Sequence, residues 1–334
     1  MADSAGPDGL VTELERALSG RGDITLRETS KSWLFFTSDS VFKLKKPIHD
    51  NFQDLSSLRA RHDNTLTEID LNRRIAPDLY RGAVRVGRGR HGRLVLDDRA
   101  AETVDWLVHM RRLPADRMLD ARIIAAKEKA DLAASIDQVA DTLCAFYRRA
   151  PRSLLSSCEL LTLREDQLAI ARSVLLHPMF SWMQSRVEGL LREMESLIEG
   201  FAKRADSEHE EQVFECHGDL RPEHVCLSHP PIIFDCLEFS RTLRLADPFS
   251  EVVFLGMECD LLGADWIKPR LIARLETGLG RTVDDERLGF YEAWHAVSRA
   301  RLCFAHLLVP KPRTPEKWAP LGERYLARAE ALVR

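Results

Sequence analysis

One segment of the chain, residues 216–235, places two carboxylates, Asp219 and Asp235, and a histidine, His224, at the mouth of a predicted hairpin. Its apolar runs at 225–227 and 232–234 are strand-like, and the Ser, His and two Pro between them favour a turn. If residue 227 pairs with residue 232, then His224 lies opposite Asp235. Directly opposed side chains are about 5 Å apart, so we expect these two groups to be neighbours.

Asp219 enters the same corner, on the loop that precedes the first predicted strand. A carboxylate beside a separate pair of ligands is typical of phosphoryl transfer. One group orients the acceptor hydroxyl and accepts its proton, while the others hold magnesium on the phosphates. The pattern therefore predicts that Asp219 is the catalytic base and that Asp235 and His224 are metal ligands. Glu238 would add a carboxylate to the metal site or cap the next loop.

The elements that must position these residues follow from hydrophobic periodicity. Short alternating runs predict a strand-rich front, and a long helical pattern within it ends before Pro77, as proline requires. After residue 114 helical spacing dominates, and this order of elements predicts an α+β protein. We expect a helix at 10–18, strands at 33–37, 41–45, 79–86, 94–96 and 104–110, and helices at 55–75, 132–146, 164–176, 180–204, 270–278 and 287–308, with a further helix starting at Asp247-Pro248.

Residues 217–235 resemble the catalytic loop of the aminoglycoside phosphotransferase and choline kinase group, which has a protein-kinase-like fold. That group carries His-Gly-Asp, then four residues and an Asn, and an Asp on the next strand. His217, Gly218, Asp219 and Asp235 match this pattern. His224 stands where the group has Asn, and an imidazole nitrogen suits zinc or late transition metals better than Mg²⁺.

The resemblance runs from about residue 30 to about residue 301 and is strongest to an uncharacterised bacterial subgroup, through residues 41–47, 71–80 and 110–114. It implies two lobes. Residues 1–110 would form a nucleotide-binding N-terminal lobe, a small antiparallel sheet with one long helix. Residues 111–334 would form a large, mainly helical lobe for catalysis and acceptor binding.

The resemblance also implies nucleotide contacts. Lys43 follows Val41 by two, as in the Val-Ala-Ile-Lys pattern of kinases, and would hold the α- and β-phosphates. Glu68 in the following helix would hold that lysine in an ion pair. Lys45 lies on the same strand face, so the choice between the two lysines stays open.

The loop 28–32 would cover the phosphates although it has no glycine. Its backbone amides and the hydroxyls of Ser30 and Ser32 could meet phosphate oxygens, and ordinary turn chemistry explains the same residues equally well. The adenine would lie between the lobes against the linker 110–114, which adds Met110 and Arg111 to the predicted contacts.

Composition excludes several classes of protein. The 334 residues carry a net charge of −4, which argues against a protein that binds nucleic acid by neutralising phosphates. No apolar run reaches the roughly 18 residues of a membrane span, and residues 1–8 lack the features of a signal peptide, so we expect a cytoplasmic protein. The seven cysteines contain no Cys-x-x-Cys and are expected to be reduced, mostly buried residues.

These observations predict a kinase that uses ATP or GTP with Mg²⁺, or Mn²⁺ in its place, and phosphorylates a hydroxyl of a small molecule. The fold cannot name that acceptor, and the sequence leaves the oligomeric state open. The acidic run 208–211, the one cluster that would suit a polycationic sugar, reads as a solvated linker. One alternative is a nucleotide-binding pseudokinase that acts through a protein partner, and it is motivated by His224. Another is a zinc protein that uses the cysteines of the 216–236 segment.

Overall fold

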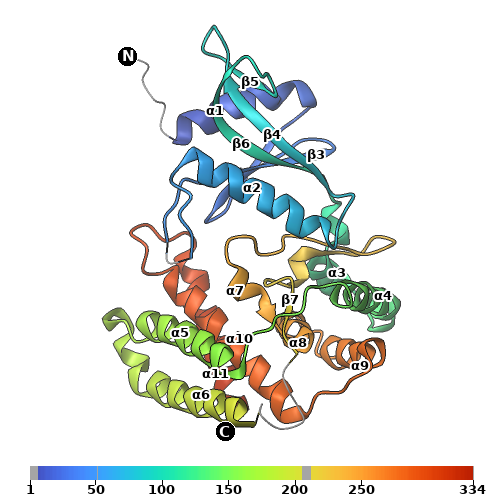
Figure 1. Ribbon diagram of the computed structural model, residues 1–334, viewed down its shortest axis with the longest axis vertical. Coiled ribbons are helices and arrows are strands. Elements are labelled where there is room, and N and C mark those ends of the chain that lie inside the picture. The colour runs from blue at the N-terminus through green and yellow to red at the C-terminus, as the bar shows by residue number, and fades with distance from the viewer. Residues whose placement is uncertain (1–6, 51, 205–211, 334) are drawn as a thin grey trace. The chain divides into compact units, whose positions relative to one another are not determined.

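The computed structural model describes residues 7–50, 52–204 and 212–333. The chain forms two compact units. The first contains residues 1–126 and 222–243, and the second contains residues 127–221 and 244–334 (Figure 1). The predicted α+β class is confirmed: an antiparallel sheet dominates the first unit and helices dominate the second.

The compact units are divided differently from the predicted lobes. The segment 222–243 returns to the first unit, where Cys226 forms a β-bridge with Met118 and the Leu227 amide donates to the carbonyl of Arg117 over 2.8 Å. The two compact units are defined by contacts in space, whereas the predicted lobes are continuous stretches of the sequence. The functional division at residue 110 stays a prediction.

The first unit is built on a six-stranded antiparallel sheet with a helix on each face. Side chains alternate across a strand, so Phe42 and Leu44 pack with Leu14 of helix α1 (Pro7–Leu18), whereas Val41 faces the side of Ile69, on helix α2 (Leu58–Arg73). The sheet order is β1 (Thr25–Glu28), β2 (Ser32–Phe36), β3 (Ser40–Lys45), β6 (Glu102–Arg111), β4 (Tyr80–Arg88) and β5 (Leu94–Leu96).

Helix α2 places charged and polar groups inside the first unit. Ser57 caps its start by accepting from the Ala60 amide over 3.1 Å, as N-cap serines do, and the helix ends before Pro77 as predicted. Its buried face includes Glu68 and Asn72, both with no exposed surface. A helix with such a face must meet partners that satisfy the buried charge.

The hairpin after residue 221 has a different register from the predicted one. Strand β8 (Val225–Cys226) pairs with β9 (Ile232–Ile233) so that Cys226 faces Ile232. The prediction that His224 lies opposite Asp235 in the ladder is therefore wrong by one residue. Leu227 leaves the hairpin to bond the Arg117 carbonyl, so the turn begins one residue earlier than the apolar run suggested.

The second unit is mainly helical, and the predicted helices are present within a few residues of their expected bounds, except that helix α5 starts seven residues earlier than expected. Helix α8 begins as expected, with the Asp247 side chain accepting from the Phe249 amide over 2.8 Å. None of the helices in the described residues is long and apolar enough to cross a bilayer. The main helices are α4 (Ala130–Tyr147), α5 (Ser157–Leu175), α6 (Gln184–Arg204), α8 (Pro248–Leu261), α9 (Ile267–Leu279), α10 (Asp285–Ala305) and α11 (Pro315–Val333), the last of which was not predicted.

Candidate active site

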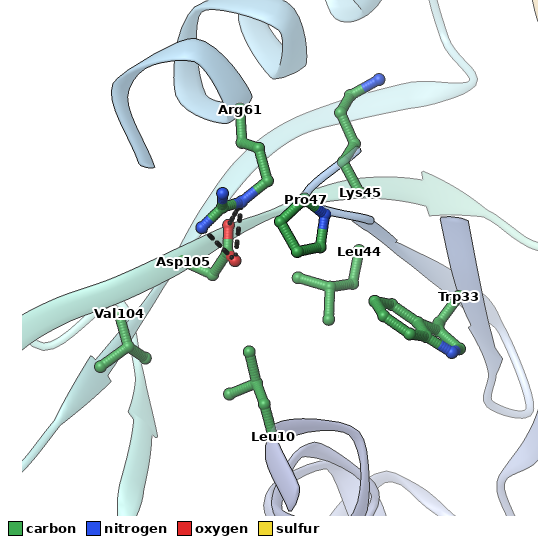
Figure 2. A pocket seen from close by; sticks show the side chains of 8 residues that line it. All are labelled: Leu10, Trp33, Leu44, Lys45, Pro47, Arg61, Val104 and Asp105. Atoms are coloured by element: carbon green, nitrogen blue, oxygen red, sulfur yellow. Dashed lines mark hydrogen bonds and ion pairs between the residues drawn. The ribbon is translucent and has the colours of Figure 1, made fainter. Parts of the chain in front are cut away.

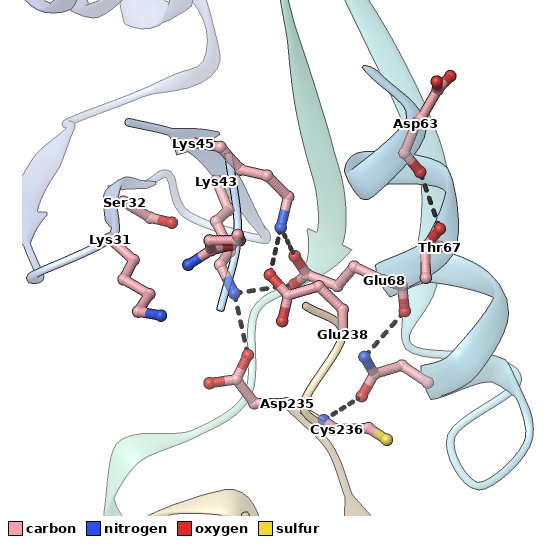
Figure 3. A network of polar contacts seen from close by, with 12 residues as sticks. Lys31, Ser32, Lys43, Lys45, Asp63, Thr67, Glu68, Asp235, Cys236 and Glu238 are labelled. Atoms are coloured by element: carbon pink, nitrogen blue, oxygen red, sulfur yellow. Dashed lines mark hydrogen bonds and ion pairs between the residues drawn. The ribbon is translucent and has the colours of Figure 1, made fainter. Parts of the chain in front are cut away.

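Two lysines and three carboxylates form a chain of alternating charge in the first unit (Figure 3). Lys43 Nζ lies 2.9 Å from Glu68 Oε1 and 3.0 Å from Asp235 Oδ1. Lys45 Nζ lies 2.5 Å from Glu68 Oε2 and 2.6 Å from Glu238 Oε1. Strand β3, helix α2 and the segment after β9 thus meet in one network, in the order Asp235, Lys43, Glu68, Lys45, Glu238.

This network runs from the interior to a partly exposed end. The side chains of Glu68 and Lys45 are 0% and 2% exposed, that of Lys43 is 13% exposed and that of Asp235 is 39% exposed. A ligand can therefore approach at Lys43 and Asp235. Burial works against the charge on Lys43, but Asp235, Glu68 and Glu238 outweigh it and raise the Lys43 pKa well above its usual value, so this lysine stays cationic.

Asp235 is held in an uncommon backbone conformation. Its φ is +63°, a left-handed value that costs free energy in residues other than glycine and that clusters at functional sites. The Asp235 amide donates to the Tyr80 hydroxyl over 3.2 Å, and the Cys236 amide donates to Asn72 Oδ1 over 2.8 Å. Asn72 also donates to the Glu68 carbonyl, so helix α2 fixes both the glutamate and the segment that carries Asp235.

Sequence reasoning gave no role to Asn72 or Tyr80. Both lie in the segment 71–80, and the resemblance of that segment to the phosphotransferase subgroup was the one sequence feature that pointed to them. Glu238 was expected at the metal or as a cap, and the structure shows it paired with Lys45. Burial raises the Glu238 pKa, but the charges of Lys45 and Lys43 outweigh burial and lower it overall.

His224 lies beside Asp235 even though the predicted register is wrong. It ends the turn Pro222–His224, is 6% exposed, and its Nε2 is 3.5 Å from Asp235 Oδ2. Among the described residues no three His, Cys, Asp or Glu side chains gather as a metal site. Mg²⁺ takes one or two protein carboxylates together with substrate phosphates, so Asp235 fits this ion and the nitrogen of His224 does not.

The predicted phosphate loop is a turn organised by Thr29. The Thr29 hydroxyl accepts from the amides of Lys31 and Ser32 and donates to the Ser32 carbonyl. Ser30 is exposed on this turn, whereas Ser32 is 3% exposed and opens β2, where it pairs with Lys45. The phosphate roles of both serines stay predictions.

Met110 and Arg111 are the last residues of β6. The Met110 side chain is buried in an apolar cluster with Val41 and Tyr80, and the Arg111 amide donates to the Leu79 carbonyl over 2.9 Å. The strand thus continues one residue further than expected. Their contact with an adenine stays a prediction.

The loop that carries Asp219 belongs to the second unit and is anchored by a buried glutamate. The amides of His217 and Gly218 both donate to the carboxylate of Glu251, the first over 3.0 Å. Gly218 has a φ of +86°, a value that glycine adopts readily. The Tyr147 hydroxyl also donates to Glu251, over 2.9 Å, so this carboxylate accepts at least three hydrogen bonds.

The carboxylate of Asp219 is 32% exposed and forms an ion pair with Arg221, whose Nε lies 3.0 Å from Oδ1. Sequence reasoning missed Glu251. Its signal was a carboxylate in the first turn of a mainly apolar helix, where a buried acceptor must find donors. The acidic run 208–211 lies outside the described residues.

A small cavity of about 170 Å³ lies elsewhere in the first unit, near helix α1 (Figure 2). Lys45 contributes its aliphatic stem to the wall and points its amine away from the cavity. Arg61 closes another side and binds both oxygens of Asp105 at 3.0 and 3.1 Å. Burial raises the Asp105 pKa despite this partner. The remaining lining residues are Leu10, Trp33, Leu44, Pro47 and Val104.

No protein-family model matches the chain. An uncharacterised protein of Mycobacterium tuberculosis, Rv2004c, is 25% identical over 290 residues, which cover 84% of this chain and 54% of that protein. The chain therefore spans about half the length of this relative.

Solved structures share the architecture at low sequence identity. A choline/ethanolamine kinase family protein from Mesorhizobium loti has a TM-score of 0.56, 13% identity and coverage of 97% of this chain and 94% of its own. The GDP and kanamycin complex of APH(2")-IIia, an aminoglycoside phosphotransferase, has a TM-score of 0.54, 14% identity and coverage of 95% and 98%. The predicted two-lobed, protein-kinase-like fold is confirmed.

Proposed function

We propose that this chain is a phosphotransferase that moves the γ-phosphate of ATP or GTP to a hydroxyl of a small-molecule acceptor. The observation that carries the proposal is Lys43, which bridges Glu68 and Asp235 on a kinase-like fold. Kinases need this pairing of a strand lysine with a helix glutamate, beside a carboxylate for the metal.

Three charged groups of the first unit would take part in binding the nucleotide. Lys43 would contact the α- and β-phosphates, and Glu68 would keep its amine directed toward them. Asp235 would hold Mg²⁺ together with the phosphates, and Mg²⁺ when bound would neutralise charge on the phosphate oxygens. The partly buried apolar residues beside Met110, which include Leu34 and Phe234, would accept the flat face of the base.

The second unit would supply the base. Asp219 would accept the proton of the acceptor hydroxyl, and Arg221 would orient its carboxylate. Glu251 would hold the backbone that presents Asp219. Most of the acceleration would come from positioning and charge neutralisation, because phosphoryl transfer asks little covalent chemistry of the protein.

A nucleotide-binding pseudokinase is the second candidate, and the observation that favours it is His224 beside Asp235. An imidazole there is a poor partner for Mg²⁺. The presence of Asp219, Asp235 and the Lys43–Glu68 pair favours the enzyme instead.

The test is a phosphate-transfer screen with ATP and GTP, each with Mg²⁺ and Mn²⁺, over sugars, amino sugars, amino alcohols and nucleosides. We expect transfer to at least one class, and its loss in Lys43→Ala. Lys268→Ala is the matched control, because Lys268 pairs with the buried Glu292 in the second unit. Nucleotide binding without transfer to any acceptor would favour the pseudokinase, and no nucleotide binding would contradict both candidates.

A further inference from the structure

We propose that Lys45 is a positioning residue for phosphate binding: it holds Glu68 and Glu238 so that Lys43 is presented to the nucleotide. This inference rests on the proposed function and adds a second lysine to it. The kinase plan needs one lysine on the helix glutamate, whereas here two lysines share Glu68.

The burial of Glu68 explains why two lysines are present. A carboxylate with no exposed surface must have partners on both oxygens, since a buried charge without partners is costly. Lys43 takes Oε1 and Lys45 takes Oε2. Each lysine thereby fixes one oxygen, and the carboxylate cannot rotate without breaking a bond to one of them.

Lys45 itself is badly placed to contact a phosphate. Its side chain is 2% exposed, its amine lies between Glu68 and Glu238, and its stem lines the cavity near α1 (Figures 2 and 3). Lys43 is more exposed and reaches Asp235. The same strand therefore offers one lysine for the ligand and one for the carboxylates.

The two lysines also hold both ends of one short segment. Asp235 bonds Lys43 and Glu238 bonds Lys45, so the turn that carries the predicted metal ligand is fastened to β3 at two points. Without the positive charge of Lys45, Glu68 and Glu238 would each lose a lysine partner, and the pull of the carboxylates would fall more heavily on Lys43. They would draw its amine toward the protein and away from a phosphate, which predicts weaker binding through Lys43.

A double-mutant cycle tests this inference. ADP affinity with Mg²⁺ would be measured by calorimetry for wild type, Lys43→Met, Lys45→Met and the double variant. We expect each single change to weaken binding about tenfold, and the double variant to bind within about twofold of Lys43→Met, because residues that act through one another are not additive. A double variant about a hundredfold weaker than wild type would show that Lys45 contacts phosphate independently and would overturn the proposal.

A second readout separates positioning from general damage. Adenosine has no phosphate, so its affinity should be unchanged in Lys45→Met, whereas ADP affinity falls. An equal loss for both ligands would overturn the proposal. Lys268→Met is the matched control, and it should change neither affinity.

If Lys45→Met does not fold, Lys45→Met/Glu238→Gln replaces it, because this double change removes the negative charge of Glu238 together with the positive charge of Lys45. This double change should weaken ADP binding when Lys43 is present. It should have no further effect on ADP binding in the Lys43→Met background. A wild type that binds no ADP would overturn the proposed function itself. A wild type that binds ADP and gives an additive cycle would overturn only the role of Lys45.

Discussion

At the scale of single residues, the site depends on ion pairs between charged side chains that are largely removed from water. Removing one partner of a buried ion pair typically costs about 3–5 kcal/mol, because the other charge is left unpaired. Glu68 is the member with most to lose, since it has no exposed surface. Asp219 and Asp235 are partly exposed, so their carboxylates can exchange partners with a ligand at a smaller cost.

Asp219→Asn should abolish phosphate transfer and leave nucleotide affinity within a few fold. An amide cannot accept the hydroxyl proton, and loss of a general base typically costs about 10²–10⁴ in rate. Single-turnover transfer and calorimetry measure the two effects. Asp265→Asn is the control, because that exposed carboxylate lies on the surface of the second unit. Unchanged turnover in Asp219→Asn would remove this residue from the mechanism.

His224→Asn should shift the metal preference of the reaction. A nitrogen ligand is a poorer partner for Mg²⁺ than for Mn²⁺, so the wild type should work at least as well with Mn²⁺, and the variant should prefer Mg²⁺. Transfer rates with each ion in both proteins measure this. The same preference in wild type and variant would show that His224 only neighbours Asp235 and does not ligate a metal.

At the scale of elements, helix α8 positions the catalytic loop. Its first turn carries Glu251, which accepts from two consecutive loop amides and from Tyr147 of helix α4. Burial and the nearby Glu251 charge raise the Tyr147 pKa well above its usual value, so the hydroxyl keeps its proton and stays a donor. The conformation of the loop that carries Asp219 therefore depends on α8 and α4, two helices that lie far from it in the sequence.

Glu251→Gln should lower kcat by about 10–100-fold while nucleotide affinity changes little. The new amide nitrogen cannot accept from a backbone amide, and one unsatisfied buried donor costs about 1–3 kcal/mol. Glu292→Gln, which alters another buried glutamate of the second unit, should lose stability without losing kcat. Equal kcat in wild type and Glu251→Gln would contradict the anchoring role.

At the scale of the whole molecule, part of the stability depends on a half-buried histidine, His295, that favours its neutral form in the folded chain. His295 of α10 stacks on Phe254 of α8 at 4.6 Å, and its Nε2 lies 2.9 Å from the Ser250 hydroxyl. Burial lowers the His295 pKa to about 4, and the nearby Arg299 also lowers it. In the unfolded chain a histidine titrates near 6.5, so the folded second unit resists protonation of this ring.

Because the folded pKa of His295 is depressed, its contribution to stability is present above about pH 6.5 and is lost as the pH falls toward 4. The two pKa values differ by about 2.5 units, which corresponds to a loss of about 3 kcal/mol. Urea unfolding of wild type and His295→Gln at pH 7.5 and 5 measures this. The variant should lose less stability between these values, and parallel losses would contradict the prediction.

The sequence alone determined most of the elements and the chemistry-bearing motif. Alternation along 41–45 predicts a strand, Pro77 predicts where the helical pattern of 55–75 must end, and the His-Gly-Asp segment with Asp235 predicts phosphoryl transfer. These are local patterns, since the rise per residue and the direction of each side chain follow from the backbone of one element. Fold class could therefore be predicted from spacing and resemblance together.

The resemblance named the pair of Lys43 with Glu68, but only the tertiary structure decided which other charges meet. Lys43 and Asp235 are separated by 192 residues, and Lys45 and Glu238 by 193, so no periodicity relates them. Strand alternation places both lysines on one face but cannot say that the deeper one binds Glu238. Beside the hairpin, the Leu227 amide likewise donates to the carbonyl of Arg117, a contact that no local pattern predicts. Burial decides such pairings, because a charge inside the protein without a partner costs free energy, and this cost depends on tertiary contacts and not on the local sequence pattern.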